Sequence, residues 1–256
     1  MAKRLYGPMT LNHTDKATLA GLYLSLFGKR ALSEFGYSGV WHAFNVFGYA
    51  LDASPASIKN YRDEFDHEIR KTTPSHPREG WKRPLKTRSK KLYDQFSSLG
   101  FSDFTDLIKG FLIPSYEKEK LISGVTKQSG DPNIAQRLMT GHAAEAYFKN
   151  HVSEIPIFSN YHVEDVTLCG CGYDFYVSRH SEFFCVEVKG LASNSGSIIM
   201  TEKEYVVARE IRDRYCLFVV RNFQRTPAHT TLFDPTVSSL VFTPQTRIVT
   251  SYSAYL

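Results

Sequence analysis

The chain has 256 residues, 42% hydrophobic and 22% charged, which is typical of a soluble globular protein with one large domain or two modest ones. It contains no apolar run of 18 residues and no apolar segment near its start, so we expect neither a membrane association nor a secretory signal and predict a cytoplasmic protein. The net charge of +5 is compatible with a polyanionic partner but does not by itself identify one.

The first half is expected to be helical. Apolar periodicity predicts a helix over Lys16–Phe35, a second and largely buried helix over Val40–Leu51, and a third over Pro55–Lys71. Ser54 and Pro55 are a favourable N-cap and first helical residue for the third helix. Three short helices suit a helix-turn-helix-like DNA reader, and a plain helical bundle fits nearly as well. Two further helices are predicted over Lys90–Ser97 and Ser102–Ile108.

A basic run follows the third helix. Between Arg70 and Lys91 the sequence has nine basic residues and a single acid, Glu79. Such a local excess is typical of a phosphate-binding surface, and a solvated linker explains the run equally well. The residues predicted to contact DNA, from the third helix and this run, are Lys59, Asn60, Arg62, Arg78, Lys82, Arg83, Lys86 and Arg88.

The pattern changes after a polar segment at Ser115–Asp131, which predicts a helical domain over residues 1–125 and a second domain over 126–256. The second domain reads as α/β, with a mixed sheet flanked by helices. Its expected elements are a helix at Ile134–Val152, strands at Val163–Leu168, Tyr173–Val177 and Phe183–Val188, a helix from a Thr201–Glu204 capping box to Arg214, a buried parallel strand at Tyr215–Phe223, and an edge strand within Thr246–Leu256.

The four cysteines all lie in this second half. Cys169 and Cys171 have the spacing of half a metal site, but no second Cys or His pair follows at zinc-finger spacing. We therefore expect four reduced thiols.

Charged residues interrupt the predicted hairpin "GYDFYVSRHSEFFCVEVKG" at Gly172–Gly190. Strand side chains alternate faces, so Glu187 and Lys189 share one face, about 7 Å apart along the strand. The turn is expected at Arg179–His180 or over Ser178–Ser181, and either even-length turn would put Asp174 opposite Cys185, one diagonal step from Glu187 on that same face. An Asp and a Glu converging there, with the backbone carbonyl of Val188, would form a hard-oxygen site for Mg²⁺.

Lys189 would be the third functional group of this cluster, orienting or acidifying a water or neutralising a phosphoryl oxygen. A partly exposed salt-bridge cluster is the common alternative for such a trio in an ordinary hairpin. The catalytic interpretation therefore requires that the three side chains gather on one face, and that they are not all locked in buried ion pairs.

The hairpin, together with "IIMTEKEYVVARE" and "YCLFVV", resembles the PD-(D/E)XK nuclease superfamily, and within it the NO VEIN C-terminal type of domain found in bacterial restriction and defence proteins. The resemblance covers roughly residues 133–222 and implies a restriction-endonuclease-like fold. It implies that Asp174 and Glu187 are metal ligands, that Lys189 is the catalytic lysine, and that Glu145 is the acid of the first helix. The proline of the family name is absent, because Tyr173 precedes Asp174.

The expected function is thus a Mg²⁺-dependent restriction endonuclease on double-stranded DNA, with Mn²⁺ as a substitute ion and no nucleotide cofactor. Cleavage of both strands usually needs two sites, which predicts a homodimer. An inactive nucleic-acid-binding module of the same fold, and a nuclease acting on RNA, single strands or branched DNA, remain alternatives, because a basic surface reads phosphate and not base.

Overall fold

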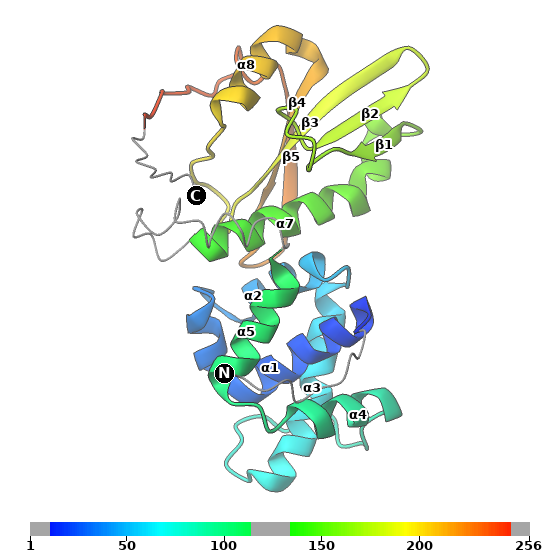
Figure 1. Ribbon diagram of the computed structural model, residues 1–256, viewed down its shortest axis with the longest axis vertical. Coiled ribbons are helices and arrows are strands. Elements are labelled where there is room, and N and C mark those ends of the chain that lie inside the picture. Colours follow the sequence, from blue (N-terminus) through cyan, green and yellow to red (C-terminus); the bar gives the residue numbers. More distant parts are fainter. Residues whose placement is uncertain (1–10, 114–133, 247–256) are drawn as a thin grey trace, which may run out of the picture.

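The computed structural model describes residues 11–113 and 134–246. It forms a helical part, α1 to α5, and an α/β part built on one five-stranded sheet (Figure 1). The predicted junction at 115–131 and the domain boundary at 125/126 lie outside the described residues. Within the described ranges, no helix is long and apolar enough to cross a membrane.

Five helices make up the helical part: α1 (His13–Glu34), α2 (Val40–Ala50), α3 (Pro55–Thr72), α4 (Thr87–Phe96) and α5 (Phe101–Leu112). Ser54 caps α3 as predicted, since its side chain accepts a hydrogen bond from the backbone N–H of Ser57 at 3.0 Å. Helices α1 and α3 approach closely at Gly21, where a Cβ would lie 2.5 Å from the Cβ of Tyr61. A glycine is therefore required at this crossing.

The sheet has the order β1-β2-β3-β4-β5. Its strands are β1 (His162–Asp165), β2 (Phe175–Arg179), β3 (Glu182–Gly190), β4 (Tyr215–Arg221) and β5 (Ala228–Phe233). The β3–β4 pair is parallel and the other pairs are antiparallel, so the sheet is mixed, as predicted. Helix α8 (Glu202–Ile211) returns the chain from β3 to its parallel neighbour β4.

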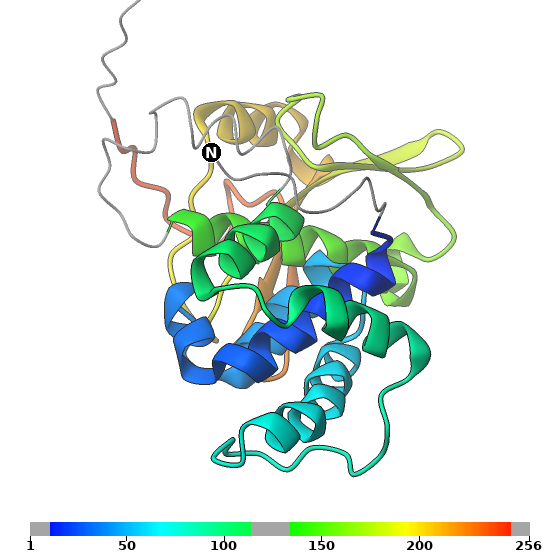
Figure 2. The same ribbon diagram turned by 60° about the horizontal axis from the view of Figure 1, so that its bottom comes forward.

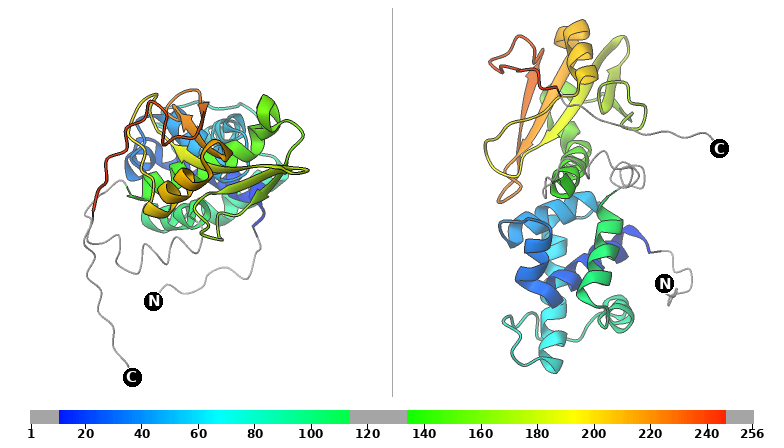
Figure 3. Two further views of the ribbon diagram at one scale, coloured as in Figure 1. Left: turned by 90° about the horizontal axis from the view of Figure 1, so that it is seen from above. Right: turned by 60° about the vertical axis from the view of Figure 1, so that its left-hand side comes forward.

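Each face of the sheet carries a helix. Helix α7 (Ile134–His151) lies between the sheet and the helical part (Figure 1; Figure 3, right), and its Phe148 packs in one core with Val186 and Val188 of β3. At Gly190 a Cβ would lie 2.7 Å from the carbonyl oxygen of Thr140, so α7 and β3 nearly touch there. Helix α8 covers the other face, where Ala208 packs with Cys185 and Tyr215.

The two parts of the chain share a core. Buried residues of α1 to α5 and of the α7 side of the sheet form one continuous apolar cluster. Asn45, 3% exposed on α2, reaches across the junction and donates from Nδ2 to the carbonyl oxygens of Phe223 at 2.7 Å and Arg225 at 2.6 Å. Tyr49 adds edge contacts to the rings of Tyr147 and Phe223. The helical part is thus packed against the sheet domain through α2.

Most predicted elements are present, with shifted ends. The strand β5 was missed, because the predicted edge strand was placed within residues 246–256, of which 247–256 lie outside the described residues. The helix expected to run to Arg214 ends at Ile211 and is followed by a 3-10 turn, Arg212–Arg214, whose first residue has a φ of 50°. All four cysteines are free thiols, as predicted.

Candidate functional site

The β2–β3 hairpin brings Asp174 to Glu187. The register pairs Phe175 with Val186 and Tyr176 with Cys185, and the N–H of Asp174 donates to the carbonyl of Val186 at 3.0 Å. Asp174 directly precedes the last pair of this ladder, and its carboxylate reaches the backbone N–H of Val188, the residue after Glu187. The charges of Asp174, Glu187 and Lys189 act on one another, so the three side chains lie close together on the α8 side of the sheet.

The predicted partner of Asp174, Cys185, is therefore wrong by two residues. The turn is formed by His180 and Ser181, with His180 at a φ of 54°, and not by Arg179 and His180. Its length is even, as expected, and Asp174 lies on the predicted face, where its charge acts on Glu187 and that of Lys189 acts on it.

Hydrogen bonds fix the three charged side chains. Oδ2 of Asp174 accepts from the backbone N–H of Val188 at 2.8 Å. Nζ of Lys189 contacts Oε1 of Glu187 at 2.5 Å and Oε2 of Glu204 at 2.7 Å. Lys189 is thus shared between two carboxylates, and Asp174 is held by the backbone of the neighbouring strand.

Glu204 is a site residue that sequence reasoning did not identify. The sequence predicted it correctly as the third residue of a capping box, and its Oε2 does accept from the N–H of Thr201 at 3.0 Å. The same oxygen also contacts Lys189. The available signal was the position of the capping box, directly after the strand that carries Lys189, because the cap places the first turn of α8 next to the end of β3.

Tyr215 forms the floor of the site and was also missed. It is fully buried beside Cys185 in the parallel register, and its hydroxyl donates to the carbonyl of Gly172 at 3.0 Å. This bond anchors the segment that leads into Asp174. Burial and the nearby carboxylates of Glu187, Glu204 and Asp174 raise the pKa of the Tyr215 hydroxyl, which therefore stays protonated.

The electrostatics of the cluster follow from burial and crowding. Glu187 is 3% exposed, and burial raises the pKa of its carboxyl well above the usual range, with Asp174 and Glu204 raising it further and Lys189 opposing. Burial also raises the pKa of Asp174 to about 6. Burial lowers the pKa of Lys189, but Glu187 and Glu204 outweigh this effect, so the net shift is upward and the ammonium stays charged.

The ligand chemistry of the cluster suits a hard cation. Asp174 and Glu187 offer carboxylate oxygens, and the carbonyl of Val188 points to the same side of β3 as that of Val186, because alternate residues of a strand direct their backbone groups alike. Mg²⁺ in proteins is commonly held by one or two carboxylates plus other oxygens and water. Within residues 11–113 and 134–246, no set of three or more His, Cys, Asp or Glu side chains is arranged to hold a metal. Any ion here would rely on two side chains and a carbonyl.

Glu145, the expected acid of the first helix, lies on α7, the helix on the sheet face opposite α8. Its ionic neighbour is His142, at 3.5 Å. At Gly141 of α7 a Cβ would meet no atom within 4 Å, so the close approach of this helix to the sheet occurs at Gly190.

The comparison with known families concerns the same hairpin and the elements around it. Residues 144–232 match the family model described as Protein NO VEIN, C-terminal. The matched segment contains Asp174, Glu187, Lys189 and Glu204, and it confirms the resemblance to the NO VEIN C-terminal domain that the sequence indicated. No curated protein and no solved structure gives a significant match.

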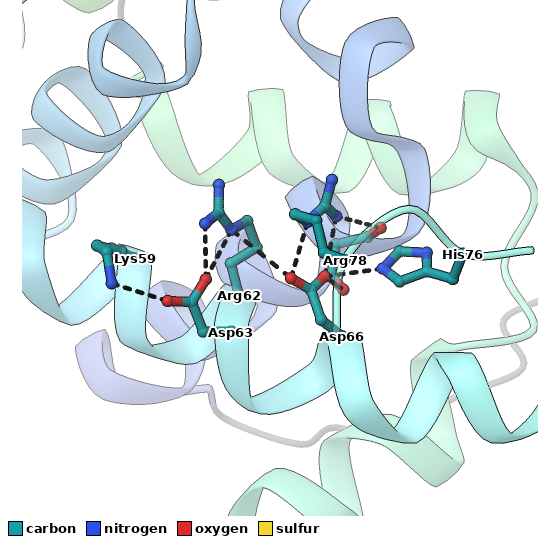
Figure 4. A network of polar contacts seen from close by, with 7 residues as sticks. Lys59, Arg62, Asp63, Asp66, His76 and Arg78 are labelled. Atoms are coloured by element: carbon teal, nitrogen blue, oxygen red, sulfur yellow. Dashed lines mark hydrogen bonds and ion pairs between the residues drawn. The ribbon is translucent and has the colours of Figure 1, made fainter. Parts of the chain in front are cut away.

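The predicted DNA contacts on α3 are engaged within the protein (Figure 4). Lys59 and Arg62 both bind Asp63, at 2.8 Å and 2.6 Å. Arg78 donates to both oxygens of Asp66, which is 1% exposed, and also to the carbonyl of Ser25. Arg78 thus joins the loop after α3 to α3 and α1, whereas the ion pairs of Lys59 and Arg62 lie within α3. Asn60 is exposed on α3.

The other predicted contacts are exposed and lie on the segment that joins α3 to α4. Lys82 is 74% exposed, and its Nζ lies 3.3 Å from Oε2 of exposed Glu79. The guanidinium of Arg83 lies over the Trp81 ring, 4.1 Å from its centroid. The backbone N–H of Lys86 donates to Oε1 of buried Glu64 at 3.0 Å. Arg88, in the first turn of α4, binds Asp15 at 2.8 Å. The loop before α4 lies at the end of the molecule away from the sheet (Figure 1; Figure 2).

Proposed function

We propose that the α/β part of this protein is a Mg²⁺-dependent nuclease of the PD-(D/E)XK type, acting on double-stranded DNA as a restriction-type endonuclease. The observation that carries the proposal is the gathering of Asp174, Glu187 and Lys189: Asp174 bonds the N–H of Val188, and Lys189 contacts Glu187 on the same face of β3. The family match over residues 144–232 places these three residues inside the domain that the sequence resembles.

Each residue has a distinct role in this proposal. Asp174 and Glu187 would bind the ion together with the carbonyl of Val188. A bound Mg²⁺ would polarise the phosphodiester and lower the pKa of a water molecule beside it. Lys189, whose charge is secured by two carboxylates, would orient that water or the phosphoryl oxygen. The Val188 N–H holds one oxygen of the Asp174 carboxylate against β3, which leaves the other oxygen for the ion.

The substrate class rests on charge and exposure. Lys82, Arg83 and Lys86 are exposed cations of the basic run, whereas Lys59, Arg62 and Arg78 have internal partners. Because the exposed cations lie at the end away from the sheet, a duplex that touches them and the site would run along the long axis of the molecule. Phosphate contacts of this kind position a duplex without reading its sequence.

Incubation with supercoiled plasmid and phage DNA in Mg²⁺, followed by end mapping, tests the proposal. We expect discrete fragments, and loss of cleavage in Asp174→Asn, Glu187→Gln and Lys189→Met. Glu182→Gln is the matched control on β3, because Glu182 is exposed and bonds to Tyr161 and Arg179, which lie outside the cluster. Cleavage by Lys189→Met at the wild-type rate would remove the catalytic assignment.

A second candidate is a nucleic-acid-binding module without catalysis. The observation that favours it is the tight contact of Lys189 with Glu187, which is almost fully buried. This module would bind duplex DNA with the same affinity in Mg²⁺ and in EDTA and would cut nothing in either. The cleavage assay, run beside a gel-shift titration, separates the two functions.

A further inference from the structure

The third carboxylate of the cluster has a fixed position. Oε2 of Glu204 accepts from the Thr201 N–H at 3.0 Å and contacts Nζ of Lys189 at 2.7 Å, and the side chain is only 15% exposed. In return, Oγ1 of Thr201 accepts from the N–H of Glu204 at 3.2 Å. The reciprocal cap therefore locks this carboxylate next to the lysine.

Charge balance makes that position consequential. The cluster contains one ammonium, Lys189, and the three carboxylates of Asp174, Glu187 and Glu204. Oε1 of Glu187 is engaged by Lys189 at 2.5 Å, so a cation that used this oxygen would have to displace the ammonium. A largely buried ammonium that lost its only counter-ion would be strongly destabilised. Glu204 provides Lys189 with a second counter-ion in the same place.

We infer that Glu204 is a positioning residue of this site, which retains Lys189 when Glu187 turns its oxygen to a divalent cation. This inference rests on the proposed function. It assigns to the first turn of α8 a role beyond capping, since the helix start fixes the ammonium beside the two metal-binding carboxylates. Lys189 then has two partners, and the cation competes for only one of them.

The test is Mn²⁺ binding to the full chain without DNA, measured by electron paramagnetic resonance of the free ion. Glu204→Gln removes the charge but keeps an acceptor that suits a capping box, so the helix start is preserved. We expect its Kd for Mn²⁺ to rise about tenfold, which corresponds to about 1.4 kcal/mol. Glu202→Gln is the matched control, because it removes an exposed charge from the same helical turn. Its Kd should stay within about twofold of the wild type.

A second comparison separates positioning from the general loss of negative charge. In a Lys189→Met background the ammonium no longer competes for Glu187, so Glu204→Gln should change the Kd by less than about threefold. A full tenfold effect in that background would overturn the positioning role. So would an unchanged Mn²⁺ Kd in Glu204→Gln alone. Equal melting temperatures of Glu204→Gln and the wild type show that the cap is intact. If the variants melt at a lower temperature, the double-mutant cycle with Lys189→Met still measures how strongly Glu204 and Lys189 are coupled in Mn²⁺ binding.

The outcomes also distinguish this inference from the proposed function. A wild-type chain that binds no Mn²⁺ overturns both. A chain that binds Mn²⁺ with the expected Glu204 dependence but cuts no DNA supports the inference and rejects the nuclease. A chain that cuts DNA and binds Mn²⁺ equally with and without the Glu204 charge rejects the inference alone.

Discussion

Asp66 is the most connected buried charge of the helical part, and its removal gives a sharp prediction. Its carboxylate accepts from Oγ of Ser25 at 2.5 Å, from Nε2 of His76 at 3.0 Å, and from two nitrogens of Arg78 at 2.7 Å and 2.9 Å (Figure 4). Burial raises the pKa of Asp66, but these bonds outweigh it and the net shift is downward. The carboxylate is therefore charged at neutral pH and satisfied on all sides.

We expect Asp66→Ala to lower the free energy of unfolding by about 3–4 kcal/mol. Breaking a buried ion pair typically removes about 3–5 kcal/mol, because the remaining charge is left without a partner. The lower part of that range applies here, since Arg78 is 29% exposed and keeps its bond to the Ser25 carbonyl at 3.0 Å. Asp63→Ala is the control on the same helix. Its partner Lys59 is 40% exposed, and its other partner, Arg62, still has Asp66 at 3.9 Å, so we expect a loss of only about 0.5–1 kcal/mol.

Urea denaturation of both variants and of the wild type measures this difference. The Asp63 carbonyl accepts from the Trp81 N–H and is untouched by the control substitution, so the loop before α4 keeps that anchor. A loss below about 1 kcal/mol in Asp66→Ala, equal to that of Asp63→Ala, would refute the reasoning. The result also bears on DNA binding, because a weaker Arg78→Ala variant would then reflect a loosened fold and not a lost phosphate contact.

Three further predictions follow from buried polar groups. His42 is fully buried, and neither of its ring nitrogens bonds to any of the described residues. Burial lowers its pKa to about 4, so the unfolded chain takes up this proton first, and the protein loses stability as the pH falls from about 6.5 toward 4. His42→Leu should reduce this acid sensitivity by up to about 3 kcal/mol in denaturation at pH 7 and pH 4.5, and an unchanged slope would contradict it. Asn45→Ala should destabilise the protein by about 2–3 kcal/mol, because it leaves two carbonyls without a donor. A loss under about 0.5 kcal/mol in urea denaturation would argue against a stabilising role of these two hydrogen bonds. Asp174→Asn, measured in EDTA, should stabilise the protein by about 1–2 kcal/mol at pH 8, because ionising a carboxyl whose pKa is raised to about 6 costs the folded state stability. Near pH 4 the wild-type carboxyl is protonated in the fold and the gain should vanish, which calorimetry at both pH values checks.

The sequence was informative where periodicity and caps act locally. The Ser54 cap, the Thr201–Glu204 capping box and the run of buried residues at 215–220 lie in the elements predicted from them. Strand β5 was missed because its residues are mostly half-buried and mix His and Thr with apolar residues, so neither a strict alternation nor an apolar run marks it. The shared core of the two parts was also not foreseen, since pairing between distant helices leaves no local pattern.

The site was predicted in part for a related reason. Face alternation along β3 is a local property, and it placed Glu187 and Lys189 together correctly. The partner of Asp174 depended on which two residues form the turn, and either choice of even turn fits the pattern. The role of Glu204 and the partners of Arg78 depend on contacts between different elements of the chain. Charge alone could not separate a cation that faces solvent from one that closes a helix junction.

The hydrogen bonds of Asn45 to the sheet domain bear on which fragments of this protein can fold. A fragment limited to residues 144–232 would begin in the middle of α7 and would lack α2, leaving the Tyr147 ring and the β4–β5 turn without their cover. Such a fragment would expose apolar surface that is buried in the intact chain, and we expect it to aggregate on expression. A fragment that keeps these contacts would have to start at or before Val40, so that α2 still covers this side of the sheet domain.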